Sequence, residues 1–128
     1  VTRSPPVVVA STSMHGTLTL WNPSSFTWVT SFRAHLLGAH GVVFSPDGRR
    51  VATGGGTSRD AVKLWDLSTR RELLTLPGQC AVSVFLAFSN DGRWLAACGR
   101  GGELNLWHAP SWEEIEAEEK KLQIVQSP

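Results

Sequence analysis

Cysteine is scarce in this 128-residue chain, which argues against two classes of small protein. Cys80 and Cys98 stand 18 positions apart, and no Cys-x-x-Cys pair occurs. Zinc sites and disulfide-dense secreted scaffolds both depend on cysteines at characteristic close spacings. We therefore expect a chain with no metal site, reduced thiols and a cytoplasmic location.

Long apolar runs and a dense charge of one sign are also missing. No stretch approaches the roughly 20 apolar residues that a membrane span requires, and residues 1–6 do not resemble a signal peptide. The formal net charge is only +1, whereas binding to nucleic acid or to an anionic membrane needs a basic face. We expect no nucleic-acid partner and no membrane partner.

Recognisable catalytic motifs are absent as well. The four histidines show no zinc-binding spacing and flank no activated serine or cysteine. Residues 54–58 superficially resemble a phosphate-binding loop, but they lack its Gly-Lys-Ser/Thr ending. We interpret this segment as a mobile hairpin loop, and we expect neither enzyme activity nor a cofactor.

What the chain does contain is an internal repeat. Segments ending in Leu-Trp place Trp21, Trp65 and Trp107 at intervals of 44 and 42 positions. The sequence Phe-Ser-Pro-Asp-Gly-Arg at 44–49 returns as Phe-Ser-Asn-Asp-Gly-Arg at 88–93, with the same offset of 44. Two different sequence features therefore repeat with nearly the same spacing.

Each copy is predicted to form β-strands. The apolar runs are four to seven residues long and are bounded by Gly, Pro, Asn and Asp. Asp47 and Asp91 are interpreted as equivalent turn residues, because each precedes a glycine that tolerates positive φ. Leu64 and Trp65 should point to opposite faces of their strand, as expected where a sheet packs between two neighbours. The indoles of Trp21, Trp65 and Trp107 are all expected to pack between such layers.

The Trp65-Asp66 dipeptide, the Phe-Ser-Pro-Asp-Gly turn and the period of about 43 residues together resemble the WD-repeat family over residues 7–108. The resemblance implies an all-β fold, a partial WD-repeat β-propeller of about three four-stranded antiparallel blades and about ten strands. The expected first blade is 1–34, without its innermost strand, the second is 35–78, and the third, also incomplete, is 79–109. An acidic C-terminal helix and tail should occupy 110–128, where a capping box at Ser111 and Glu114 predicts a helix over 112–121.

The resemblance also implies a buried hydrogen-bonded tetrad in the second blade. Its members would be His35, Thr53, Asp60 and Trp65, although Asp60 stands five rather than six residues before its tryptophan. The first copy retains Ser11 and Trp21 of this pattern, and the third retains only Trp107. A full tetrad is therefore expected in the second blade alone.

Partners of this family usually contact loops at the rim of the central channel. By this analogy His40, Arg59 and Arg100 are possible partner-binding residues. Trp28, together with Phe26 and Phe32 on an alternating strand, is predicted to pack on an outer edge rather than to stack on a ligand.

Fewer than three blades cannot close a ring, because closed propellers have roughly four to eight. Either further blades precede residue 1, so that this chain is the C-terminal part of a larger propeller, or several copies assemble. The function expected from the resemblance is a non-catalytic scaffold for protein–protein interaction. Two alternatives stay open: a regulatory or sensing propeller attached to an upstream catalytic domain such as a protein kinase, and a ligand- or glycan-binding ring of several copies.

Overall fold

The computed structural model describes residues 8–79, 82–109, 117 and 120–121, and within them ten strands form three antiparallel sheets. The first sheet contains, in spatial order, β1 (Val9–Thr12), β2 (Thr17–Asn22) and β3 (Thr27–Arg33). The second contains β4 (Ala39–Phe44), β5 (Arg50–Gly55), β6 (Val62–Asp66) and β7 (Glu72–Leu76). The third contains β8 (Ser83–Phe88), β9 (Trp94–Gly99) and β10 (Leu104–His108). The predictions of an all-β fold and of about ten strands are confirmed.

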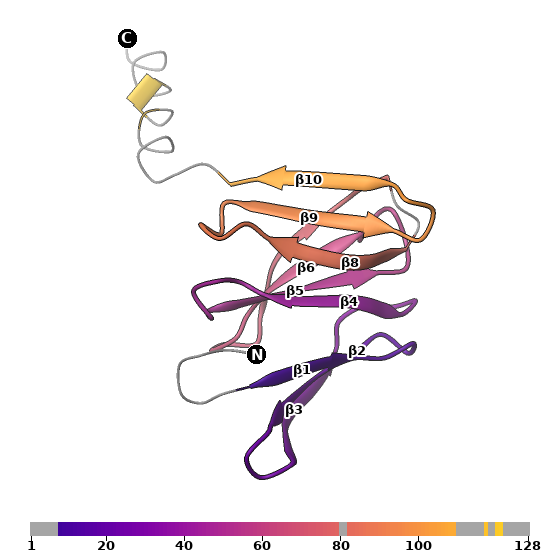
Figure 1. Cartoon of the computed structure of the whole chain (residues 1–128), viewed down its shortest axis with the longest axis vertical. Helices are drawn as coiled ribbons and strands as arrows, with labels where there is room; N and C mark the ends of the chain where they lie inside the picture. The colour runs from indigo at the N-terminus through magenta and orange to yellow at the C-terminus, as the bar shows by residue number, and fades with distance from the viewer. Residues whose placement is uncertain (1–7, 80–81, 110–116, 118–119, 122–128) are drawn as a thin grey trace.

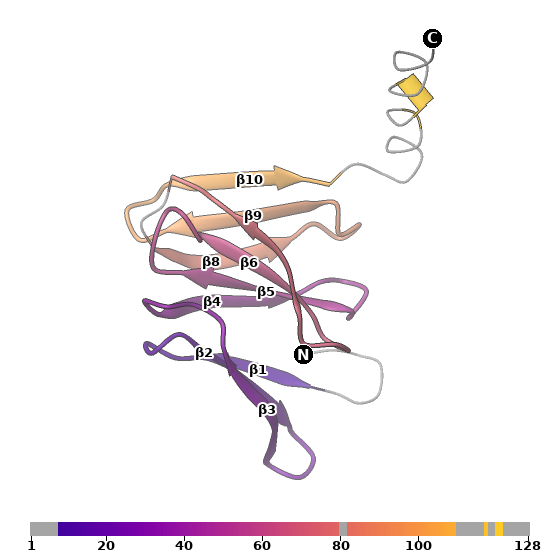
Figure 2. The ribbon, with the colours of Figure 1, turned by 180° about the vertical axis from the view of Figure 1, so that it is seen from behind.

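The three sheets lie one on another in a stack, with the first sheet at the bottom and the third at the top of Figure 1. The view from behind in Figure 2 shows the same order. The first strands of the second and third sheets, β4 and β8, contact each other, and β1 contacts β4. Successive copies of the repeat therefore form successive layers.

Strand pairing shows which strands correspond between the layers. Val9 of β1 pairs with Trp21 of β2, just as Val51 of β5 pairs with Trp65 of β6. Strand β1 thus corresponds to β5, and within the described residues the first sheet has no counterpart of β4. By the same comparison, the described part of the third sheet has no counterpart of the outer strand β7.

The Phe-Ser-x-Asp-Gly-Arg segments form the turns that join the first two strands of the second and third sheets. The amide of Gly48 donates to the carbonyl oxygen of Ser45 at 2.9 Å, and Gly48 has a φ of 72°. Asp47 accepts hydrogen bonds from the Ser45 hydroxyl and from the Arg49 amide. Asp91 accepts equivalent bonds in the third sheet, so the local sequence is sufficient to shape both turns.

Alternation along the strands gives every sheet two apolar faces. We call the face that carries the repeat tryptophan the Trp face, and the opposite face, which carries the leucine before it, the Leu face. The tryptophans are Trp21, Trp65 and Trp107, and the leucines are Leu20, Leu64 and Leu106.

The hydrophobic core consists of two layers, each formed where a Leu face meets a Trp face. In the lower layer, Leu18 and Phe32 of the first sheet pack with Val51 and Trp65 of the second. The upper layer joins the Leu face of the second sheet to the Trp face of the third, through Ala52, Val62, Leu64, Leu95, Ala97 and Trp107. The second sheet is therefore covered on both faces.

The repeat tryptophans differ in burial, although the sequence predicted that all three pack between layers. Trp65 is buried and Trp107 is half-buried, whereas Trp21 is 37% exposed. The prediction is wrong for Trp21 because no described sheet covers the Trp face of the first sheet.

The interpretation of residues 54–58 as a mobile loop is wrong for its first two residues. Gly54 and Gly55 belong to β5 and are buried. A Cβ atom on Gly54 would lie 2.2 Å from the carbonyl oxygen of Ser83, so the absent side chain allows the backbones of the second and third sheets to approach.

The outer-edge packing predicted for the aromatic residues near β3 is also wrong in part. Phe32 packs on Trp65, with ring centroids 4.9 Å apart. Phe26, however, lies before the strand with a φ of 57°, and both Phe26 and Trp28 are exposed. A bulge opposite Leu20 and Trp21 interrupts the alternation that the prediction assumed.

Most of the helix predicted over 112–121 lies outside the described residues. Ala117, Lys120 and Lys121 are described and have helical conformation. In the part of the chain that is described, no helix combines the length and apolar composition needed to cross a bilayer.

We expect Leu18→Ala to lower the free energy of unfolding by about 2–5 kcal/mol, because it removes a fully buried side chain from the lower core layer. Leu37→Ala alters an exposed leucine and should change that free energy by no more than about 0.5 kcal/mol. Urea unfolding followed by tryptophan fluorescence measures both. Equal losses for the two variants would show that the lower layer is not a packed core.

Candidate functional site

A polar network crosses the lower core layer beside Trp65. The indole Nε1 of Trp65 donates to the hydroxyl oxygen of Thr53 at 2.9 Å. The Thr53 hydroxyl lies 2.8 Å from Nε2 of His35, and Nδ1 of His35 lies 3.3 Å from a carboxylate oxygen of Asp60. The structure thus brings together the four residues that the family resemblance indicated, from β5, β6, the turn between them and the segment before β4.

A single assignment of protons satisfies the whole chain of hydrogen bonds. The indole N–H donates to Thr53, the Thr53 O–H donates to Nε2 of His35, and Nδ1–H of His35 donates to Asp60. Burial lowers the pKa of His35 despite the opposing hydrogen bond and charge of Asp60. Neutral His35 fits this arrangement, since the imidazole then accepts one hydrogen bond and donates one.

The carboxylate of Asp60 is held from two sides. Partial burial on its own raises the pKa of Asp60, but hydrogen bonds from Thr57 and His35 outweigh it and leave the pKa below its ordinary value. The amide of Asp60 also donates to the Thr57 hydroxyl at 3.4 Å. Asp60 is therefore ionised at neutral pH and orients the imidazole.

Gly55 provides the space in which the imidazole lies. A Cβ atom on Gly55 would come within 2.5 Å of Nδ1 of His35 and 2.3 Å of the Asp60 carbonyl oxygen. The sequence pattern predicts a loop at Gly55 and does not indicate this role. The only sequence clue is the position of Gly55 two residues after Thr53 in an otherwise regular strand pattern.

The corresponding positions in the first sheet form a shorter network. The indole Nε1 of Trp21 donates to the Ser11 hydroxyl at 2.8 Å, near the exposed surface of the sheet. His15, which occupies the position of Asp60, is exposed. In the third copy, Ala97 replaces Thr53 and offers Trp107 no hydroxyl group.

Asp66, which follows Trp65, stabilises the turn between β6 and β7. Its carboxylate accepts hydrogen bonds from the Ser68 hydroxyl and from the amides of Ser68 and Thr69. These bonds, the Ser68 hydroxyl above all, lower the pKa of Asp66 to about 2.

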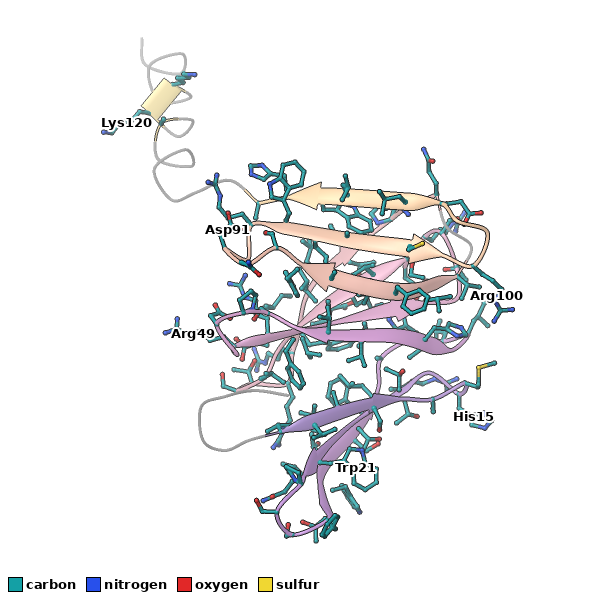
Figure 3. All side chains as sticks on the ribbon, in the orientation of Figure 1. His15, Trp21, Arg49, Asp91, Arg100 and Lys120 are labelled. Atoms are coloured by element: carbon teal, nitrogen blue, oxygen red, sulfur yellow. The ribbon has the colours of Figure 1, made fainter. Side chains whose placement is uncertain are left out.

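The three possible partner-binding residues belong to one end of the stack, where β1, β5 and β9 end. Arg59 and Arg100 are exposed in the turns after β5 and β9, and His40 is half-buried at the start of β4. Figure 3 shows Arg100 and His15 at this end, and Arg49 and Asp91 at the opposite end.

The same end carries an exposed apolar surface that the sequence analysis did not identify. We call it the apolar rim, and it consists of Met14, Leu36 and Leu37, which are 71–75% exposed. The segments that carry these residues are neighbours, because the Ala39 amide donates to the Ser13 carbonyl oxygen at 3.0 Å. The sequence could not predict this surface, because its residues lie in two different loops and show no periodic pattern.

A cleft of about 730 Å³ lies near the opposite end, between the second and third sheets. Leu74 and Leu76 of β7 line one side, and Trp107 of β10 lines the other. Arg50 and Asp91 add charged groups to its lining. In the described part of the chain, no group of three or more His, Cys, Asp or Glu side chains is placed to hold a metal ion.

Stacked antiparallel sheets with a repeated inner strand define the chain as a protein of the β-propeller class. The family model described as "WD domain, G-beta repeat" matches residues 26–66 and 70–108, which are more than half of the chain. The chain belongs to the WD-repeat family. Trp21 lies outside the matched residues.

Three WD-repeat relatives illustrate the similarity. "Small ribosomal subunit protein RACK1" of Caenorhabditis elegans is 31% identical over 120 residues, which cover 94% of this chain and 35% of RACK1. "U3 snoRNP-associated protein-like EMB2271" of Arabidopsis thaliana is 29% identical over 129 residues, covering 84% of this chain and 26% of the relative. The "Ribosome biogenesis protein WDR12 homolog" of Chlamydomonas reinhardtii is 35% identical over 115 residues, which cover 81% of this chain and 25% of the relative. The chain thus spans about a third or less of the length of these relatives.

We expect Thr53→Val to lower the free energy of unfolding by about 1–3 kcal/mol, because it leaves the buried indole N–H of Trp65 and Nε2 of His35 without the hydroxyl between them. Thr53→Ser keeps the hydroxyl and loses only a methyl group, at a cost of about 0.8 kcal/mol. Chemical denaturation of the two variants measures the difference. A valine variant as stable as the serine variant would mean that the network contributes nothing.

The lowered pKa of His35 should make the stability depend on pH. Just below pH ~6.5, the unfolded chain binds a proton at this position that the folded protein does not. The contribution of His35 to the free energy of unfolding should therefore be fully present above pH ~6.5. It should decrease as the pH is lowered toward the folded-state pKa of His35. His35→Gln should flatten this dependence, whereas His15→Gln, at an exposed position, should preserve it. Urea unfolding at several pH values measures the slope, and identical slopes for both variants would exclude His35 as its source.

Proposed function

We propose that this chain is a non-catalytic scaffold for protein–protein interaction, and that it binds a protein partner through the apolar rim. The observation that carries the proposal is the exposure of Met14, Leu36 and Leu37 at one end of the stack. Scattered exposed leucines are common on protein surfaces, but a group of large apolar side chains on adjoining loops is typical of an interaction site.

Hydrogen bonds hold the backbone beneath the rim. The guanidinium of Arg33 donates to the carbonyl oxygens of His35 and Leu36, at 3.4 and 3.0 Å. On the other loop, the Gly16 amide donates to the Ser13 carbonyl oxygen at 3.0 Å. A surface ordered in advance loses less conformational entropy on binding, which favours affinity.

Charge around the rim favours a partner with acidic groups. Arg59 and Arg100 are exposed in turns at the same end, and His15 lies beside Met14. We propose that an apolar segment of the partner covers the rim while acidic side chains meet the two arginines.

The buried network supports the rim from below. His35 immediately precedes Leu36, so the bonds from its imidazole to Thr53 and Asp60 fix the start of the loop that carries two rim residues. We propose that the four residues have this structural role and no catalytic one.

The names of the three relatives agree with a scaffold. They describe a ribosomal subunit protein, a protein associated with a ribonucleoprotein, and a ribosome biogenesis protein. All three descriptions refer to assemblies of several components. The identity of this chain's partner and its cytoplasmic location stay predictions.

The proposal is tested with a partner identified by cross-linking and then purified. Leu36→Glu combined with Leu37→Glu places two carboxylates in the rim and should weaken binding of the purified partner at least tenfold, or by about 1.4 kcal/mol or more. Isothermal titration calorimetry measures the dissociation constants.

Phe26→Glu is the matched control, because it adds a carboxylate at another highly exposed apolar position, in the turn between β2 and β3. The control should bind as tightly as the original chain. Equal affinity of the rim variant and the control would remove the rim from the interface. Failure of every purified candidate to bind would contradict the scaffold function itself.

A further inference from the structure

Four exposed arginines lie in two adjoining turns of the second sheet, at the end of the strands opposite the apolar rim. We call them the arginine group, and they are Arg49, Arg50, Arg70 and Arg71. The amide of Leu67 donates to the carbonyl oxygen of Arg49 at 3.0 Å, and Asp66 pairs with Arg50 in the register of β5 and β6. Figure 3 shows Arg49 at this end and Arg100 at the other. The sheet that carries the group is covered on both faces by its neighbours.

The positive charge of the arginine group is not balanced by ion pairs. Among the residues that the structure describes, none of the four guanidinium groups is paired with a carboxylate. The carboxylates of Asp47 and Asp66 instead accept hydrogen bonds from hydroxyl and amide groups of their own turns, and Glu72 pairs with Lys63. The two turns contain four arginines against two aspartates, so they carry an excess of positive charge.

The shape of the two turns does not require arginine, as the other copies of the repeat show. Phe26 stands 44 positions before Arg70, and the two residues have nearly the same positive φ, 57° and 60°. Trp94 stands 44 positions after Arg50, behind an equivalent turn. Positive φ is unfavourable for any residue with a side chain, whereas glycine adopts it without strain. Turn geometry therefore does not explain the arginines.

The composition of the turns favours one class of anion. Sites for single-stranded nucleic acid combine cations with aromatic side chains that stack on the bases, and sites for anionic membranes combine them with large apolar side chains. Residues 45–50 and 66–71 contain no aromatic residue, and Leu67, their one leucine, is half-buried. The planar guanidinium group binds a carboxylate through two parallel hydrogen bonds. Aspartate and glutamate side chains of a protein therefore suit this surface best.

We propose that the arginine group binds an acidic segment of a partner protein, with at least two Asp or Glu side chains paired to guanidinium groups. This surface lies at the opposite end of the strands from the apolar rim, so a partner at one surface leaves the other accessible. The chain can then hold two proteins at once, which goes beyond the binding of one partner at the rim.

Fluorescence anisotropy with a labelled hexaglutamate peptide tests the proposal on the chain as it stands. The original chain should bind this peptide and should not bind hexaglutamine, which has the same length and no side-chain charge. Added salt should weaken the binding, because it screens exposed charges. Arg49→Gln combined with Arg71→Gln should raise the dissociation constant about fivefold, as the loss of two exposed charge pairs predicts.

Arg59→Gln combined with Arg100→Gln is the matched control, because it removes the same charge from exposed positions at the end of the apolar rim. The control should bind hexaglutamate as tightly as the original chain. Equal losses in the two double variants would reduce the effect to net charge and overturn the proposal. An original chain that does not bind hexaglutamate, or that binds labelled hexauridylate more tightly, would also overturn it.

Arg70→Gly separates binding from folding. Glycine removes the guanidinium group and accepts the positive φ of this position. The variant should therefore keep the urea midpoint of the original chain and bind hexaglutamate about twofold more weakly. A lower urea midpoint with unchanged binding would give Arg70 a structural role and contradict its place in the group. The rim variant at Leu36 and Leu37 should bind hexaglutamate normally, so the two surfaces are tested separately.

Discussion

The structure depends on the packing of a Leu face against a Trp face. A dipeptide of leucine and tryptophan on a central strand directs one large apolar side chain to each side of the sheet. Covering an apolar face removes it from water and stabilises the sheet, and the second sheet is covered on both faces by the two core layers. Layer upon layer, the same contact joins the three copies of the repeat.

The buried network ties this packing to the surface of the molecule. Trp65 lies in the lower core layer and also donates the first of the hydrogen bonds that link Thr53, His35 and Asp60. His35 belongs to the segment between the first and second sheets, so its bonds attach that segment to β5. These bonds therefore hold the segment that leads to Leu36 and Leu37 beside β5.

The differences between the copies have a physical consequence. Trp65 has a full set of partners, Trp21 bonds to Ser11 alone, and Trp107 faces Ala97. Indole rings still pack in both core layers where a neighbouring sheet is present. Apolar packing is therefore sufficient to stack the sheets, and the network adds the position of one connecting segment.

Several features could be predicted from residues close together in sequence. The β-strands follow from the short apolar runs, and the turns at Asp47 and Asp91 follow from local hydrogen bonds. The residues of the network were indicated by family resemblance. The errors at Gly54, Gly55 and Trp28 arose where distant backbone contacts or a bulge override the local pattern.

The sequence by itself determined the repeat, the turns at Asp47 and Asp91 and the assignment of leucine and tryptophan to opposite faces, because these depend on residues close together in the chain. Tertiary structure alone decided which faces are covered, that a Cβ atom at position 55 would collide with His35, and that the loop carrying Met14 lies beside the segment carrying Leu36 and Leu37. Those properties depend on distances between segments far apart in the chain, and no local pattern of residues encodes them.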